Sequence, residues 1–150
     1  MKKILILAVS LIGFAQAKAQ LNPITWTFSA KKTGDKMYEV EMKASIQEKW
    51  HLYSQVQPED AIVIPTTFTF NPNPLFTVDG KIMENGKLEK FSDKTLGVSA
   101  NQFSNTVSFV QKIKMKANAK TNLTGTVEYQ TCDDKKCLPP KTVTFSIPIK

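Results

Sequence analysis

The stretch YEVEMKASI, residues 38–46, alternates apolar and polar side chains without a break. A period of two is typical of a β-strand with one face buried and the other in water. Residues 25–30 show the same alternation, with Trp26, Phe28 and Ala30 as the apolar members. Between the two segments, KTGDK at 32–36 is a turn signal of the kind that joins hairpin strands. Together they predict an antiparallel hairpin with one apolar face.

Alternation continues through most of the remaining chain. The apolar members of these runs are, in order, Phe68 and Phe70; Val107, Phe109, Ile113 and Met115; Leu123, Val127 and Tyr129; and Val143, Phe145, Ile147 and Ile149. No segment beyond the N-terminus has a helical period, and Pro and Gly recur between the runs. The pattern predicts an all-β protein, an antiparallel β-sandwich of immunoglobulin-like architecture. Between Leu75 and Phe103 the alternation weakens, so we expect a short strand or two with mobile loops there.

The N-terminal segment has the three parts of a secretory signal peptide. Two lysines precede an apolar run from Ile4 to Phe14, and Ala17-Lys18-Ala19 offers a small-x-small cleavage site. The run is too short for a spanning helix, which needs about twenty residues. We therefore expect that residues 1–19 are removed and that residues 20–150 form one domain. This domain is expected to be exported, in the periplasm of a Gram-negative cell, without membrane insertion.

Charge and composition argue against one class of partner. The formal net charge is +7, falling to +4 without the three lysines of the signal peptide, and every basic residue is lysine. Arginine makes the bidentate contacts typical of sequence-specific nucleic-acid readers, and this chain has none. We therefore expect no nucleic-acid partner. Export also places the cysteines in an oxidising compartment, where a disulfide forms and persists.

The only two cysteines, Cys132 and Cys137, lie in VEYQTCDDKKCLPP, residues 127–140. If the strand that ends here keeps its alternation, its apolar residues point inward and Cys132 points toward solvent. The two prolines that follow donate no backbone hydrogen bond and hold the chain in an extended or turned path. We expect the pair on a stiffened loop at one end of the sandwich.

Three kinds of cysteine site are conceivable. Structural zinc takes four ligands, and beyond the two cysteines the chain offers one histidine, His51, so we expect no metal site. A structural disulfide closing a loop of about six residues contributes roughly 2 kcal/mol, against over 4 kcal/mol for long loops. A redox pair needs an accessible sulfur, a thiolate and a second cysteine near enough to resolve the mixed disulfide. Four intervening residues satisfy this last condition.

The charges beside the cysteines do not decide between a structural disulfide and a redox-active pair. Lysines precede Cys137 and favour a thiolate there, whereas aspartates follow Cys132 and oppose one. The residues alone leave a structural and a redox-active disulfide equally open. They also do not say which sulfur attacks a partner.

Two segments resemble a known family. VEYQTCDDKKCLPP followed by KTVTFSIPI, residues 127–149, resembles the end of the periplasmic N-terminal domain of the DsbD thiol:disulfide interchange proteins. KWHLYSQVQPEDAIVIPTTFTF, residues 49–70, is similar to the family's aromatic x-L-Y strand and the segment after it. The resemblance extends from Trp26 to Ile149. It implies an immunoglobulin-like sandwich and a thiol:disulfide oxidoreductase activity, with no cofactor.

The resemblance also implies site residues. Cys132 and Cys137 are expected to be the exchanging pair, and their expected neighbours are His51, Tyr53, Tyr129 and Pro139. His51 departs from the family, in which a tyrosine is expected at this place. The family covers its disulfide with a cap loop that carries an aromatic residue. The candidate here, Met83–Lys87, has none, and Phe91 is the nearest substitute.

The partners implied by the resemblance are proteins. Electrons are expected to come from a separate, membrane-embedded donor of the DsbD/CcdA type. They are expected to pass to periplasmic thioredoxin-like proteins, including those of cytochrome c maturation, or to disulfide isomerases. The alternative function is an exported immunoglobulin-like binding or structural domain whose short disulfide is inert.

Overall fold

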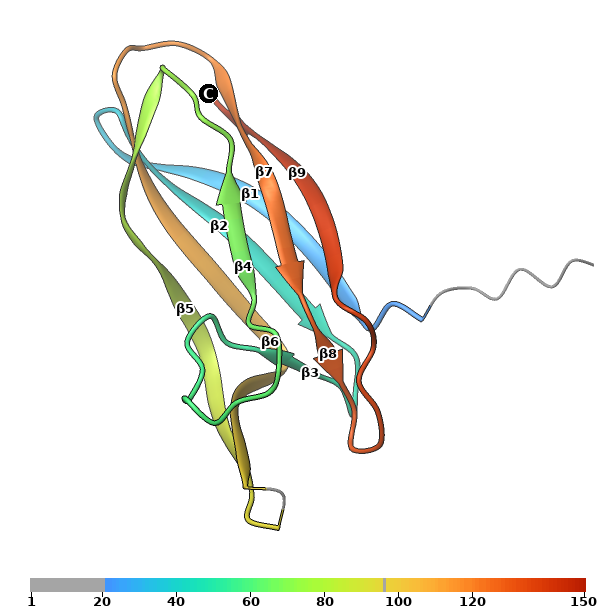
Figure 1. Ribbon diagram of the computed structural model, residues 1–150. Helices are drawn as coiled ribbons and strands as arrows, with labels where there is room; N and C mark the ends of the chain where they lie inside the picture. Colours follow the sequence, from blue (N-terminus) through green and yellow to red (C-terminus); the bar gives the residue numbers. More distant parts are fainter. Residues whose placement is uncertain (1–20, 96) are drawn as a thin grey trace, which may run out of the picture.

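Nine β-strands form the part of the chain that the computed structural model describes, residues 21–95 and 97–150 (Figure 1). In chain order they are β1 (Ile24–Gly34), β2 (Met37–Ile46), β3 (His51–Tyr53), β4 (Thr67–Phe70), β5 (Phe76–Asp93), β6 (Val98–Met115), β7 (Thr121–Tyr129), β8 (Thr131–Cys132) and β9 (Lys141–Ile149). These residues contain no α-helix. The predicted signal peptide lies outside the described residues.

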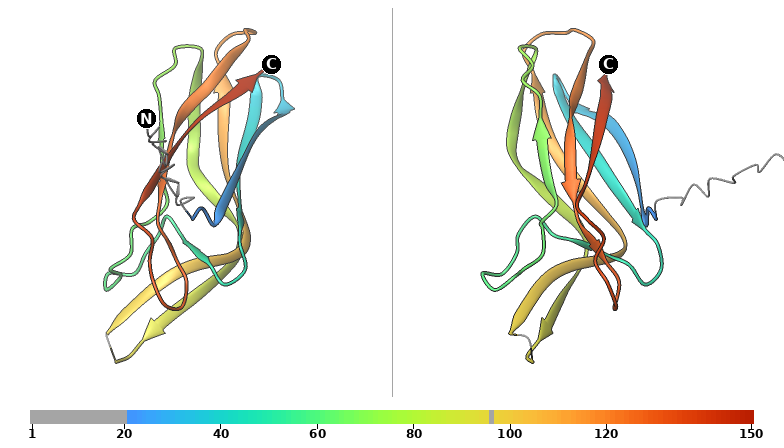
Figure 2. Two further views of the ribbon diagram at one scale, coloured as in Figure 1. Left: turned by 90° about the vertical axis from the view of Figure 1, so that its right-hand side faces the viewer. Right: turned by 45° about the vertical axis from the view of Figure 1, so that its right-hand side comes forward.

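The strands form two antiparallel sheets. In the larger sheet the order is β1-β2-β6-β3-β8, and β5 pairs with the other edge of β6. The smaller sheet has the order β4-β7-β9. Figure 2 shows the two sheets packed face to face. The all-β, immunoglobulin-like sandwich expected from the alternation is confirmed.

The core lies between the sheets and contains the predicted apolar residues. All five apolar positions of residues 38–46 are buried. Aromatic rings join the two layers: Trp26 of β1 meets Phe68 of β4 with ring centroids 5.8 Å apart, and Phe28 meets Phe145 of β9 at 5.1 Å. Offset and edge-on ring pairs add to the burial of apolar surface. The larger sheet is therefore anchored to the smaller one along β1.

The segment between Leu75 and Phe103 differs from the sequence prediction. In place of short strands and mobile loops, β5 and β6 form one long hairpin of 18 residues on each side. Most β5 side chains are exposed, so no alternation was needed to bury one face. Two irregularities in the β5–β6 register, at 79–83 and 86–88, obscure the period further. Gly86 belongs to the second of these, where an added Cβ would lie 3.1 Å from the Val107 side chain.

Three segments gather at the end of the sandwich away from the C-terminus (Figures 1 and 2). They are the tip of the β5–β6 hairpin, the β3–β4 loop (residues 54–66) and the loop between β8 and β9. Hydrogen bonds tie the β3–β4 loop to the hairpin: the Ser99 hydroxyl donates to Asp60 Oδ1 at 2.5 Å, and Gln57 Nε2 donates to the Asn101 carbonyl at 2.8 Å. This end of the fold carries both cysteines.

Candidate functional site

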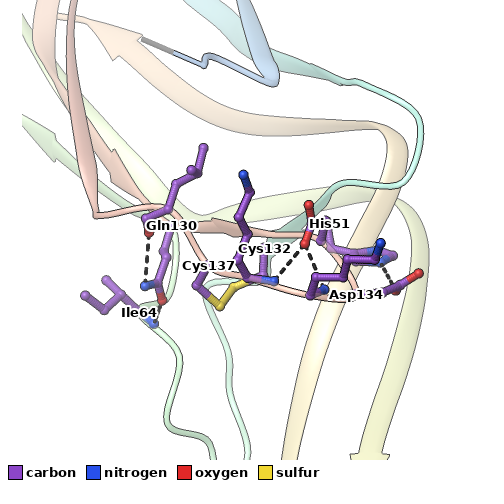
Figure 3. Close-up of a disulfide and its surroundings, with 10 residues drawn as sticks. His51, Ile64, Gln130, Cys132, Asp134 and Cys137 are labelled. Atoms are coloured by element: carbon purple, nitrogen blue, oxygen red, sulfur yellow. Dashed lines mark hydrogen bonds and ion pairs between the residues drawn. A yellow bond between two sulfur atoms is a disulfide. The ribbon is translucent and has the colours of Figure 1, made fainter. Parts of the chain in front are cut away.

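The two cysteines form a disulfide within a tight hairpin, residues 131–138, named here the cysteine hairpin (Figure 3). Cys132 and Cys137 are antiparallel bridge partners with their Cα atoms 3.9 Å apart. At the base of the hairpin the Leu138 N–H donates to the Thr131 carbonyl at 2.9 Å. In its turn the Asp133 N–H donates to the Lys136 carbonyl at 2.9 Å. The backbone thus holds both sulfurs together on one turn.

Asp133 shapes the turn of the cysteine hairpin. Its Oδ1 accepts hydrogen bonds from the backbone N–H groups of Lys135, at 2.8 Å, and Lys136, at 2.7 Å. The Lys135 N–H is the main cause that lowers the pKa of Asp133 below its usual 3.8, and the Lys136 N–H and both lysine charges act in the same direction. The ionised carboxylate therefore stabilises the turn.

The cysteines differ in exposure, and Cys132 contradicts the sequence prediction. Cys132 is 5% exposed, whereas Cys137 lies on the surface. The predicted outward orientation of Cys132 was wrong because the chain passes from the smaller sheet to the larger one at Gln130. Tyr129 pairs with Lys141 in the smaller sheet, but Thr131 pairs with Leu52 in the larger one. This crossing interrupts the alternation, so Thr131 and Cys132 are both buried.

His51 and Tyr53 lie beside the disulfide, where the sequence placed them. His51 is the direct cross-strand partner of Cys132 in the β3–β8 ladder. Tyr53 is 5% exposed and packs with Cys132 and Ala100 in a small apolar cluster. Burial raises the pKa of Tyr53 above its usual 10.0, so its ring stays neutral and supports the sulfur by packing.

A groove of about 610 Å³ opens onto the disulfide. Its wall includes the two cysteines, His51 and Tyr53, and two apolar side chains from neighbouring segments, Ile62 and Phe91. Ile62 of the β3–β4 loop is 78% exposed and Phe91 of β5 is 48% exposed. Apolar side chains this exposed, in one groove with a disulfide, are typical of a surface that another molecule covers.

The two cap candidates differ in position. Met83–Lys87 belongs to the middle of β5 and does not line the groove, so the expected cap loop is a strand segment. Phe91 lies nearer the tip of the hairpin and does line it. The aromatic substitute is therefore the one beside the disulfide.

Tyr129 and Pro139 lie elsewhere. They line a separate cavity of about 120 Å³, together with Pro23 and Leu138. Tyr129 is 2% exposed and packs edge-on against Trp26 with ring centroids 5.5 Å apart. Burial raises the pKa of Tyr129 above 10.0, and the Trp26 indole offsets part of this effect. The structure therefore does not bring these two residues into the groove with His51 and Tyr53.

Several groups at the site were not singled out from the sequence. Gln130 Nε2 donates to the Leu138 carbonyl at 3.3 Å, and Gln130 Oε1 accepts from the Ile64 N–H at 3.0 Å (Figure 3). This side chain fixes the apolar β3–β4 loop to the cysteine hairpin. The run AIVIP at 61–65, apolar but without alternation, was the signal for an exposed apolar loop. The side-chain partners of His51 are Ser104 on β6 and Asp134 on the turn, and no sequence spacing connects them.

Residues 21–95 and 97–150 contain no group of three or more His, Cys, Asp or Glu side chains able to hold a metal ion. Within the same ranges, no helix is long and apolar enough to cross a bilayer.

Residues 17–148 match the family described as "Thiol:disulfide interchange protein DsbD, N-terminal". The chain belongs to this family. Its members are thiol:disulfide interchange domains, so the oxidoreductase class and the resemblance stated from the sequence are confirmed. No curated protein sequence matches the chain.

Solved structures support the same fold. The DsbD N-terminal domain of Neisseria meningitidis in its reduced form has a TM-score of 0.56 and 15% identity, covering 83% of this chain and 84% of that one. The DsbD N-terminal domain in its complex with the PilB N-terminal domain, also from N. meningitidis, has a TM-score of 0.51 and 15% identity, covering 87% of this chain and 88% of that one. The N-terminal periplasmic domain of ScsB from Proteus mirabilis has a TM-score of 0.52 and 15% identity, covering 83% of this chain and 44% of that one.

Proposed function

We propose that this domain relays electrons through the Cys132–Cys137 disulfide in the periplasm. Residues 1–19 act as its signal peptide, and residues 20–150 form the exported domain. The donor is a membrane-embedded protein of the DsbD/CcdA type. The acceptors are thioredoxin-like proteins, including those of cytochrome c maturation, or disulfide isomerases. The observation that carries the proposal is a disulfide with one exposed cysteine in a groove that the exposed apolar side chains of Ile62 and Phe91 also line.

The exposure of the two cysteines supports a different role for each. An incoming thiolate attacks one sulfur of a disulfide, and access decides which sulfur that is. Cys137 is exposed and Cys132 is 5% exposed, so partners reach Cys137. Cys132 then leaves as the thiolate. In the opposite direction, when the reduced domain passes electrons to an acceptor, Cys132 resolves the mixed disulfide.

The electron balance follows from this order. When the domain is reduced, a donor thiolate bonds to Cys137 Sγ, and the Cys132–Cys137 bond breaks with its electron pair on Cys132 Sγ. The donor's second thiolate then attacks the donor sulfur of the mixed disulfide and releases Cys137 as a thiolate. The donor loses two electrons and two protons and becomes a disulfide, and the cysteine pair gains both. The same steps in reverse reduce an acceptor.

The apolar walls of the groove favour a protein partner. Ile62 and Phe91 line the groove with the disulfide, and the hydrogen bonds of Gln130 and Asp60 fix the β3–β4 loop that carries Ile62. Rigid apolar side chains around a reactive centre reduce the entropy cost of docking. That the N. meningitidis DsbD N-terminal domain forms a complex with the PilB N-terminal domain supports this mode of use.

One observation favours the alternative, an inert disulfide in a binding domain. Cys132 packs into a cluster with Tyr53 and Ala100, as structural cysteines do. The reduction potential of the pair separates the two functions, because structural disulfides of exported proteins have potentials below about −300 mV and exchange disulfides lie above this value.

Trapping of a covalent adduct tests the relay. Cys132→Ala keeps the exposed Cys137 and removes the resolving thiol, so a mixed disulfide with a partner cannot be released. Expressed in the periplasm, this variant is expected to give a reducible high-mass band on a non-reducing gel, whose second protein mass spectrometry identifies as thioredoxin-like.

Two matched variants control the trapping. Cys137→Ala keeps only the buried thiol and should give far less adduct, and the double serine variant should give none. If Cys132→Ala carries only glutathione, the relay is wrong and the binding domain with an inert disulfide becomes the better account.

A further inference from the structure

The side chain of Gln130 bonds to two other segments at once. Its Nε2 donates to the Leu138 carbonyl at 3.3 Å, and its Oε1 accepts from the Ile64 N–H at 3.0 Å (Figure 3). These two contacts settle the orientation of the amide, because an N–H binds its oxygen and a carbonyl binds its nitrogen. Gln130 precedes the first arm of the cysteine hairpin, Leu138 ends the second arm, and Ile64 belongs to the β3–β4 loop.

The bond to Leu138 closes a gap between two stretches of backbone pairing. On one side of the gap the Leu138 N–H donates to the Thr131 carbonyl, and on the other β9 begins to pair with β7 at Lys141. The residues between, 139–140, are both proline and have no N–H to donate. The Gln130 amide therefore joins the two arms at the point where the second arm has no backbone donor.

The two cysteines must stay close when no covalent bond joins them. A mixed disulfide at Cys137 is released when Cys132 attacks it, and this step is faster the nearer the second thiol is held. In the oxidised domain the disulfide itself joins the two arms of the hairpin. After reduction only hydrogen bonds join them, so a bond at the base of the hairpin has its largest effect in the reduced domain.

We propose that Gln130 is the positioning residue of the cysteine pair, holding Cys132 near Cys137 through its bond to Leu138. The inference rests on the proposed function, since it concerns how the mixed disulfide is released. Without this bond the reduced hairpin gains conformational freedom that the disulfide denies to the oxidised one. The effective concentration of one thiol at the other then falls, and closure of the disulfide becomes less favourable.

The experiment measures the redox equilibrium of the mature domain with glutathione. The two thiols of the domain and one glutathione disulfide give the protein disulfide and two glutathione thiols, so two electrons and two protons pass to glutathione. Acid quenching, alkylation and mass spectrometry give the fractions of dithiol, mixed disulfide and disulfide. If glutathione leaves the disulfide unreduced, dithiothreitol takes its place.

Gln130→Met keeps the length of the side chain and removes both hydrogen bonds. Its equilibrium constant for disulfide formation should be about fivefold lower than that of the natural sequence, the effect of one hydrogen bond of ordinary strength. By the two-electron conversion, this is a reduction potential about 20 mV higher. In glutathione, the mixed disulfide at Cys137 should become more populated relative to the closed disulfide.

Gln130→Glu separates the two bonds of this side chain. A carboxylate still accepts from the Ile64 N–H but has no proton for the Leu138 carbonyl, so the equilibrium constant should fall as in Gln130→Met. Gln57→Met is the matched control. Gln57 bonds to Asn101 with both ends of its amide and fixes the same loop, but its hydrogen bonds do not reach the cysteine hairpin. Its equilibrium constant should equal that of the natural sequence.

A purely structural bond gives a different result. It would stabilise the oxidised and reduced domains alike, so its loss would lower the free energy of unfolding of both and leave the equilibrium constant unchanged. Urea unfolding of both redox forms of each variant therefore accompanies the titration. An unchanged constant in Gln130→Met overturns the positioning role, and so does an equal fall in Gln57→Met. A fall in Gln130→Met that Gln130→Glu does not share overturns the action through Leu138.

These outcomes can be told apart from failure of the proposed function. Glutathione and dithiothreitol are not protein partners, so the equilibrium does not depend on whether Cys132→Ala traps one. Failure of the trapping alone would remove the relay and leave the effect of Gln130 on the cysteine pair in place. Successful trapping with an unchanged constant in Gln130→Met would remove only the inference about Gln130.

Discussion

Cys132 and Cys137 are bridge partners in one small hairpin, yet Cys132 is 5% exposed and Cys137 lies on the surface. The difference arises because β8 belongs to the larger sheet, where Tyr53 and Ala100 cover Cys132. After the turn the chain leaves the sheet, and Cys137 faces the groove. A reagent that reaches one sulfur of the reduced pair must therefore prefer Cys137.

The first prediction concerns alkylation of the reduced domain. Iodoacetamide should modify Cys137 about tenfold faster than Cys132, the factor that a local opening costing about 1.4 kcal/mol imposes. Timed quenching followed by peptide mass spectrometry measures both rates. In urea the two rates should become equal. Faster modification of Cys132 in the folded domain would contradict the assignment of Cys137 as the residue that partners reach.

The second prediction concerns the stability that the disulfide supplies. Replacing both cysteines by serine should lower the free energy of unfolding by about 2 kcal/mol or less, because a loop of about six residues restrains the unfolded chain little. Urea unfolding followed by tryptophan fluorescence measures this, since Trp50 lies in the core and Trp26 packs against it. A loss of 4 kcal/mol or more, comparable to removal of a long-loop bridge, would indicate a structural disulfide.

The third prediction concerns the apolar walls of the groove. Phe91→Ala and Ile62→Ser should each weaken binding of the partner trapped by Cys132→Ala about tenfold, the effect of truncating an apolar anchor at an interface. Both side chains are largely exposed, so the free energy of unfolding should change by only about 0.5 kcal/mol. Calorimetric titration measures the affinity.

Leu88→Ala is the matched control for Phe91→Ala. Leu88 belongs to the same strand and is 45% exposed, but it does not line the groove. Its truncation should leave the affinity unchanged. Equal weakening by Leu88→Ala and Phe91→Ala would place the docking surface on the hairpin as a whole and not around the disulfide.

The sequence predicted the sandwich well because its core obeys a simple rule. A strand with one face in the core must alternate, and β2, β7 and β9 all do. The same rule failed where this condition is absent. β5 has little buried surface, so nothing in its composition distinguishes a strand from a loop. The predicted orientation of Cys132 was wrong for another reason. The chain passes between sheets at Gln130, and alternation holds only within one strand.

The candidate site was predictable in part. The cysteine pair and the x-L-Y segment are local motifs, so the sequence could name Cys132, Cys137, His51 and Tyr53. The contact of His51 with Ser104 was not predictable, because Ser104 comes from β6 and meets His51 only through the register of β3 on β6. Tyr129 and Pro139 are close to the cysteines in sequence but line the cavity on the other side of the cysteine hairpin.

The last prediction concerns acid and the turn of the cysteine hairpin. Hydrogen bonds from Lys135 and Lys136 lower the pKa of Asp133 below 3.8 in the folded domain, so at acid pH the unfolded chain takes up the proton first. The stabilisation by the carboxylate is therefore complete above 3.8 and is lost as the pH falls through the folded pKa.

Asp133→Asn keeps an oxygen that accepts both N–H groups and removes the charge, so it isolates the ionic part. The natural sequence should be more stable than this variant at neutral pH, and the difference should vanish as the pH falls below 3.8. Urea unfolding at a series of pH values measures it. Asp134→Asn is the matched control, because Asp134 is 85% exposed and neighbours the same turn. If its difference from the natural sequence shows the same loss in acid, the effect comes from the net charge of the turn and not from the Asp133 hydrogen bonds.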